Sequence, residues 1–309
     1  MSVVSDDGTR TQRWGRDAAR CVRRGGMASL CSSTLGSGKT LIALVDGMPV
    51  LNHPALHGAP VEIVPIHASS DDRGSKAADA HATFIASMFV GAQFGSLGLC
   101  PACPLLAIAA VDESFLRSET NPLDVARRIV LGLLEAIRRN ARIIQISLEF
   151  GFGSSPATRL IADAIDACVS RGTAVVLASG GGHLRLPNDL LWLPGVVPVC
   201  AADEAGEVLC DERWGAMMAL KGLAAPGTRI PGALLPDGTG LLAGSSYAAS
   251  FVTATLALLM SMVPGVLPLE AAGVLRHQRS IGISAGHPVY LDADLSLNRL
   301  RLMKGVLHD

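Results

Sequence analysis

The stretch from Ser37 to Gly47, SGKTLIALVDG, decides between two different folds. Its first half ends in Gly38-Lys39-Thr40, as a nucleotide-phosphate loop does, whereas its second half is an apolar run that stops at Asp46. A phosphate loop follows a strand, begins with a glycine and precedes a helix, so that backbone amides face the phosphates. Here Ser33 occupies the position of the first glycine, no apolar strand precedes it, and a β-rich run follows Thr40. The sequence therefore favours Asp46, at the carboxyl end of a strand, as the residue that carries the chemistry.

Composition narrows the class of protein. The chain has 309 residues, a net charge of −1 and 4% aromatic residues, which argues against a nucleic-acid partner. A chain of this length can bury a large core as one α/β domain. Its seven cysteines are an odd number and are scattered, which indicates reduced thiols in the cytoplasm. The single Cys100-x-x-Cys103 pair supplies too few ligands for a closed zinc site, so no metal is expected. No other cofactor is expected either.

Two segments of the chain have an unusual composition. Residues 1–38 are charged and glycine-containing and lack the apolar run of a secretory signal, which predicts a polar, flexible extension ahead of a single domain at 39–309. Residues 238–269 carry no charge and are long enough to span a membrane. Glycines and serines interrupt the first half of that segment, however. We therefore expect a buried central helix from about Tyr247 to Val263 rather than a membrane partner.

Apolar runs alternate with helical patterns along the chain. The expected strands are 41–45, 105–111, 143–148, 174–178 and 196–201, and the expected helices are 80–91, 123–140 and 157–171. Strands that alternate with crossover helices predict an α/β fold with a doubly wound, mostly parallel sheet and helices on both faces. Functional side chains in such folds lie beyond the carboxyl ends of the strands.

Three polar residues occupy positions of that kind. Asp46 ends a strand, His81 opens an apolar helix, and Ser246 lies between a glycine-rich loop and the buried helix. An imidazole held by a carboxylate can take the proton of a serine, which then becomes a nucleophile. Taken singly, each residue also fits a turn, a helix start or an N-cap.

Three motifs around these residues resemble those of the subtilisin-like serine proteases, whose triad runs in the order Asp, His, Ser. They are VDGMPVLNHPAL from Val45, HATFIASMFVGA from His81 and GSSYAASFVTATLALL from Gly244. Ala82 stands where the family usually has glycine, Ser245 where it has threonine and Ser250 where it has proline. Within the family, the chain is similar to proteases that trim precursor peptides in cyanobactin-type pathways. Asp46 followed directly by glycine, LGLCPACPLLAI and PLDVARRIVLGLLEAI carry that likeness.

The resemblance implies a serine endopeptidase that acts on a peptide or protein. Ser246 would be the nucleophile, His81 the general base and Asp46 its partner. Substrate would pair as an extended strand with Ser147, Leu148 and Glu149. Ala178, Ser179 and Gly180 would line the pocket that holds the substrate residue just before the cleaved bond. Glu149 stands where the family usually has glycine. It either selects a basic or polar group on the substrate or is a solvated loop residue.

One departure bears on the mechanism. In VVLASGGG, residues 175–182, Gly181 occupies the position of the asparagine that donates to the oxyanion in this family. Loss of that donor lowers turnover about 10²–10³-fold in subtilisin. The backbone N–H of Ser246 remains, and His183 or Asn188 could replace the missing side chain. Two functions stay open: a slow, selective protease, or a pseudoprotease that only binds peptide. The oligomeric state cannot be predicted.

Overall fold

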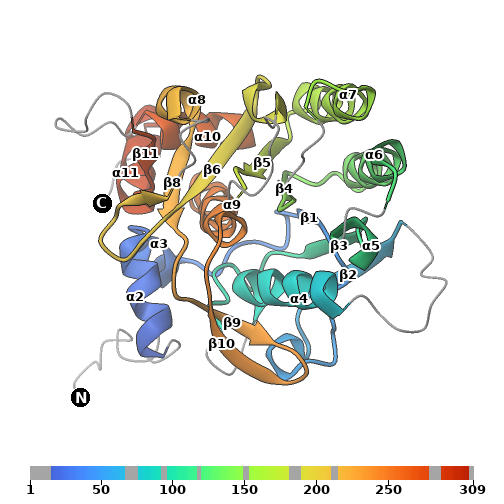
Figure 1. The fold of residues 1–309 in the computed structure, drawn as a ribbon. Helices are drawn as coiled ribbons and strands as arrows, with labels where there is room; N and C mark the ends of the chain where they lie inside the picture. The colour runs from blue at the N-terminus through green and yellow to red at the C-terminus, as the bar shows by residue number, and fades with distance from the viewer. Residues whose placement is uncertain are drawn as a thin grey trace, which may run out of the picture.

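The computed structural model describes residues 15–66, 76–91, 96–116, 120–148, 153–180, 189–209, 215–277 and 287–305. Within these residues a nine-stranded sheet forms the centre of the molecule and a separate two-stranded hairpin lies below it (Figure 1). The strands of the sheet are β1 (Ile42–Asp46), β2 (Val61–Pro65), β3 (Leu105–Ala109), β4 (Ile143–Ile146), β5 (Ala174–Ala178), β6 (Val196–Ala202), β7 (Val208–Leu209), β8 (Leu223–Pro226) and β11 (Val289–Tyr290). The hairpin consists of β9 (Ile230–Leu234) and β10 (Gly238–Leu242).

The order of the strands reverses at one point in the sheet. The strands follow one another as β11-β8-β6-β5-β4-β1-β3-β2, all parallel, with only β7 antiparallel at the end of β6. On one side of β1 lie β3 and then β2, the next two strands along the chain. The chain then crosses to the other side of β1, where β4 begins the rest of the sheet. In parallel sheets ligands bind at the carboxyl ends of the strands where the order reverses. Here that point lies between β1 and β4.

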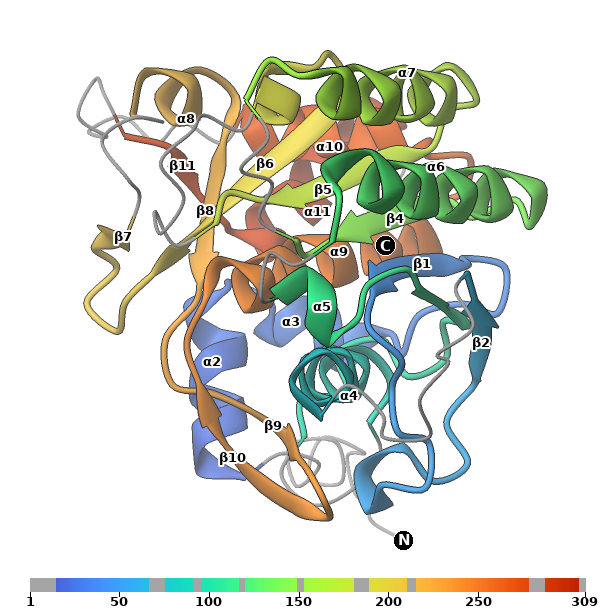
Figure 2. The ribbon, with the colours of Figure 1, turned by 45° about the vertical axis from the view of Figure 1, so that its right-hand side comes forward.

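Two hydrophobic cores cover the two faces of the sheet. Ile42 and Leu44 of β1 belong to one core, and Ala43 and Val45 belong to the other, because successive side chains of a strand point to opposite faces. The first core takes its helical residues from α2 (Arg16–Arg24), α3 (Ala28–Ser33), α4 (Lys76–Val90), α9 (Ser245–Met262), α10 (Pro268–Arg276) and α11 (Ala293–Met303). The second takes them from α6 (Pro122–Arg138), α7 (Pro156–Ser170) and α8 (Gly215–Lys221). Figure 2 shows α6 and α7 side by side on the face of the sheet that the second core covers.

Sequence signals mark where several helices begin. Asn121 and Ser155 are N-caps whose side chains accept from backbone N–H groups of α6 and α7, and a proline follows each of them. The short α5 (Glu113–Leu116) and the 3₁₀ turns η2 (Pro54–Leu56) and η3 (Asp189–Trp192) complete the described helical segments.

The helix α9 is the centre of the first core. It passes the length and composition test for a membrane span, but 78% of its residues are buried inside the protein, as expected for a central core helix. It packs on β4, β5, β6 and β8. Its N-cap, Gly244, makes no side-chain capping bond, so the N–H groups of the first turn are left for another acceptor.

The prediction of a flexible extension at residues 1–38 is wrong for the part that the structure describes. Residues 16–33 form α2 and α3, and Met27 and Leu30 are fully buried in the first core. Asp294 of α11 accepts from the N–H groups of Ser29 and Leu30, at 3.1 and 2.8 Å, and so caps α3 from the far end of the chain. Arg24 donates to the backbone carbonyls of Ala202, Asp203 and Thr228. This segment is therefore integrated into the domain.

The other expected elements are confirmed, with shifted ends. The structure has a strand at each of the five expected places, and a helix at each of the four. The strand expected at 143–148 ends earlier, at Ile146, because Ser147 and Leu148 leave the sheet at its carboxyl edge. The α/β fold with a mostly parallel sheet and helices on both faces is thus confirmed. The six cysteines in the described residues are buried thiols that form no disulfide with one another.

Candidate active site

Three elements carry the candidate catalytic residues. Asp46 is the last residue of β1, His81 lies near the start of α4, and Ser246 is the second residue of α9. The backbone carbonyl of Asp46 accepts from Ala110, which keeps the end of β1 in register with the end of β3. All three residues therefore lie at the carboxyl edge of the sheet, beside the reversal between β1 and β4.

Asp46 and His81 form a direct pair. The Nδ1 of His81 lies 2.9 Å from Oδ1 of Asp46, whose side chain is 1% exposed, whereas that of His81 is 27% exposed. The N–H of Gly47 also donates to Oδ1, at 2.8 Å. Burial by itself lowers the pKa of His81, but the charge and hydrogen bond of Asp46 outweigh it and hold the pKa above its ordinary value. With Nδ1 facing the carboxylate, Nε2 is left to exchange a proton on the other side of the ring.

One aromatic ring lies beside this pair, and a second ring packs against the first. The ring of Tyr247 lies against that of His81, with centroids 5.8 Å apart, and against Phe84, with centroids 4.7 Å apart. Burial and then the charge of Asp46 raise the pKa of Tyr247 to about 12, so its hydroxyl stays protonated at neutral pH. Tyr247 directly follows Ser246, so its contact with His81 places the first turn of α9 beside the imidazole.

The side chain of Ser246 has a different partner. Its Oγ donates to the backbone carbonyl of Ser147, at 3.3 Å, and no hydrogen bond joins it to His81 in the described structure. Ser246 also sits at the uncapped N-terminus of α9, where the free N–H groups and the helix dipole favour negative charge. The position thus combines a serine hydroxyl with backbone donors for an oxyanion, at the start of a helix that packs against α4, which carries His81. Catalytic hydrogen bonds are often long or misaligned without substrate and tighten when substrate binds.

The predicted substrate-binding residues fall into two groups. Ser147 and Leu148 follow β4. Ala178 is the last residue of the neighbouring strand β5, and Ser179 and Gly180 follow it. Gly180 has φ +86°, and its N–H donates to Oγ of Ser245, at 3.1 Å, so this segment is tied to the start of α9. Glu149, Gly181, His183 and Asn188 lie outside the described residues.

Gln145 was missed by the reasoning from sequence. It lies on β4, is fully buried, and donates hydrogen bonds to Ser147 and to the first turn of α9. The signal was present, since a single amide within an Ile-Ile-Gln-Ile run needs a hydrogen-bond partner inside the protein.

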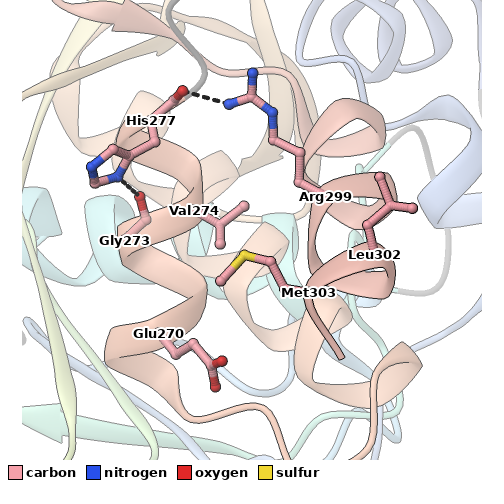
Figure 3. Close-up of a pocket in the computed structure, with 7 residues that line it drawn as sticks. All are labelled: Glu270, Gly273, Val274, His277, Arg299, Leu302 and Met303. Atoms are coloured by element: carbon pink, nitrogen blue, oxygen red, sulfur yellow. Dashed lines mark hydrogen bonds between the residues drawn. The ribbon is translucent and has the colours of Figure 1, made fainter. Parts of the chain in front are cut away.

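Two pockets accompany this framework. One of about 700 Å³ lies beside the hairpin and is lined by Val50, Asn52, Ala80, Leu234, Leu235 and Pro236. Ala80 precedes His81, so this mostly apolar pocket adjoins the candidate site. The other, of about 550 Å³, lies between α10 and α11 and is lined by Glu270, Gly273, Val274, His277, Arg299, Leu302 and Met303 (Figure 3). None of the three candidate catalytic residues lines it.

The described residues contain no group of three or more His, Cys, Asp or Glu side chains that could hold a metal ion. His53, which lies in the aspartate motif, is buried and has a structural role. Its Nε2 lies 3.2 and 3.0 Å from the carbonyls of Leu234 and Gly238, so it holds the two strands of the hairpin.

Comparison with known proteins relates this geometry to a class of proteases. No family model matches the sequence, and no curated protein matches it. The structure is similar to a serine-to-alanine mutant of the protease domain of PatA, with 26% identity, a TM-score of 0.74, and coverage of 87% of this chain and 97% of the other. It is also similar to the prenylagaramide maturation protease PagA, with 26% identity, a TM-score of 0.73, and coverage of 89% and 98%. The PatG macrocyclase in complex with peptide, at 21% identity and a TM-score of 0.73, covers 90% of this chain, is itself covered to 96%, and supports the fold alone. The resemblance to subtilisin-like, cyanobactin-type maturation proteases is thereby confirmed.

Proposed function

We propose that this subtilisin-like chain is a serine endopeptidase that processes a precursor peptide during the maturation of a natural product. The observation that carries the proposal is the buried contact between Asp46 and His81, 2.9 Å long, beside the uncapped start of α9 that bears Ser246. The maturation proteases among the structural neighbours support the class of substrate.

In the proposed mechanism, Ser246 Oγ attacks the scissile carbonyl while Nε2 of His81 takes its proton. Asp46 orients the ring and stabilises the imidazolium that forms. The oxyanion accepts from the backbone N–H of Ser246, and the helix dipole of α9 adds favourable charge. His81 then returns the proton to the leaving amine, and water hydrolyses the acyl-enzyme through the same two residues.

The peptide would lie along the ends of β4 and β5. Ser147 and Leu148 offer backbone groups on one side and the segment from Ala178 to Gly180 on the other, as an added strand requires. The mostly apolar pocket lined by Ala80 has room for a substrate side chain. Turnover is expected to be slow, because Gly181 offers no side-chain donor.

A peptide-binding pseudoprotease is the second candidate, and one observation favours it. Ser246 donates to Ser147 rather than to His81, so the nucleophile is not yet engaged with its base. In that case the groove would hold peptide without cutting it.

A fluorophosphonate probe separates the two functions, because its reaction requires an activated serine. Attack by Oγ forms the serine–phosphorus bond, fluoride leaves, and the proton passes to His81. We expect wild type to be labelled and Ser246→Ala not to be. A wild-type chain that binds peptide but never reacts with the probe would establish the pseudoprotease.

A further inference from the structure

Gln145 is a polar residue in an otherwise apolar place. It is 0% exposed, and it lies on β4 among isoleucines, between the neighbouring strands β1 and β5. An amide that is buried without hydrogen bonds costs several times the free energy of a typical hydrogen bond, so its partners indicate why it is there.

Its amide nitrogen reaches three oxygen atoms. Nε2 lies 2.6 Å from Oγ of Ser147, 3.0 Å from Oγ of Ser250 and 3.2 Å from the backbone carbonyl of Ser246. A carbonyl only accepts, so the nitrogen of the amide must face Ser246. Oε1 has no hydrogen-bond partner within the described part of the chain, which makes Gln145 a donor in this network. It bridges β4 and the first turn of α9.

Ser250 of α9 links Gln145 to Ser246 by a second route. Its Oγ donates to the backbone carbonyl of Ser246, at 3.1 Å, and accepts from Gln145. The proline expected here from the resemblance would offer neither the hydroxyl nor a backbone N–H. Gln145 and Ser250 therefore act as a matched pair on one carbonyl group.

The hydroxyl of Ser246 depends on the same strand. It donates to the backbone carbonyl of Ser147, whose own Oγ is held by Gln145. One buried side chain thus fixes both the backbone of Ser246 and the residue that receives its hydroxyl. An error of about 1 Å in the position of a reacting group can lower a rate about 100-fold.

We propose that Gln145 is a positioning residue for Ser246, and that Ser250 is its partner in place of the usual proline. The proposal rests on the proposed serine protease function. Gln145 touches neither substrate nor the reacting atoms; it sets the angle at which the first turn of α9 presents Ser246 to His81.

The test compares the covalent step with binding. Gln145→Met keeps the length and much of the volume of the side chain but removes the donor. We expect kinact for a fluorophosphonate to fall about 10- to 100-fold while KI stays within about twofold, because the groove is unchanged. The pH midpoint of labelling should not move, since the Asp46–His81 pair is untouched.

Two further variants separate positioning from a general loss of stability. Thr253→Val, on the same helix, removes another fully buried hydroxyl, one without a hydrogen-bond partner in the described structure, and should label as wild type does. Ser250→Ala should lower kinact by a smaller factor, and combining it with Gln145→Met should cost less than the product of the two separate effects.

The outcomes are distinct. Labelling of Gln145→Met at the wild-type rate, or an equal loss in Thr253→Val, overturns the positioning role and leaves the proposed function standing. A fall in kinact that only follows the fraction of unfolded protein, measured by urea denaturation, also overturns it. Wild type that never labels overturns the proposed function and this inference with it.

Discussion

Gly47 lies so close to the first turn of α4 that a Cβ on it would be 2.4 Å from the backbone carbonyl oxygen of Ala78. The contact is between backbone groups, so neither can move aside as a flexible side chain could. The glycine directly after Asp46 therefore lets α4 approach closely enough for His81 to reach the carboxylate.

Gly47→Ala should push α4 away from β1. We expect a loss of about 1–3 kcal/mol in the free energy of unfolding, as in other overpacked cores, together with a large loss of probe labelling. Urea denaturation and the labelling rate measure the two effects. Gly273→Ala is the matched control, because nothing lies within 4 Å of the added Cβ. If Gly47→Ala were as stable and as reactive as that control, the close contact would not be needed.

The raised pKa of His81 predicts the pH dependence of the reaction. The imidazole must be neutral to take a proton, so labelling should rise with pH through a midpoint above the ordinary value of about 6.5. The same shift stabilises the folded protein below pH of about 6.5, and this contribution disappears as the pH rises through the folded pKa. NMR titration of the His81 ring gives the midpoint directly. Asp46→Asn removes the charge that raises the pKa, so its midpoint should be lower, and an unchanged midpoint would contradict the assignment.

Ser245 should matter because it holds Gly180. In Ser245→Ala the N–H of Gly180 loses its acceptor, which costs about 1–3 kcal/mol if the group stays buried and unpaired. We expect weaker binding of peptide inhibitors as the end of β5 loosens. Ser245→Thr keeps the hydroxyl and should bind as wild type does. Equal inhibition constants for all three proteins would show that the bond to Gly180 does not shape the groove.

The packing of α3 gives a prediction about stability alone. Leu30 is fully buried, so Leu30→Ala should lower the free energy of unfolding by about 2–5 kcal/mol. Leu35, whose side chain is 46% exposed, provides the comparison, and Leu35→Ala should cost much less. Thermal or urea denaturation distinguishes the two. A flexible N-terminal extension, as expected from the sequence, would instead make both substitutions harmless.

The sequence predicted the sheet better than it predicted the N-terminal segment. Apolar runs such as Ile42 to Val45 are buried on both faces, and that periodicity is readable without coordinates. In α2, by contrast, many charged side chains surround a narrow stripe of Ala18, Cys21 and Val22. The stripe has helical spacing, but the charges and the flanking glycines favoured the prediction of a flexible segment. What buries it comes from distant parts of the chain, which local patterns do not reveal.

The site shows the same division. The position of Asp46 at the end of β1 followed from motif and topology, and that of His81 from its motif, although α4 begins five residues before His81. The structure brings these two side chains into contact. The link from Gly180 to Ser245 depends on a positive φ angle and on two segments 65 residues apart. The bridge from Gln145 to Ser246 spans 101 residues. Contacts of this kind depend on the finished packing of α9 against the sheet.

The cap that Asp294 places on α3 has a consequence for how the protein is made. Leu30 is synthesised long before Asp294, which lies 264 positions later in the chain. The amides at the start of α3 therefore have no bond to Asp294 until α11 has been synthesised. A nascent chain halted before α11 would therefore leave the start of α3 without this cap.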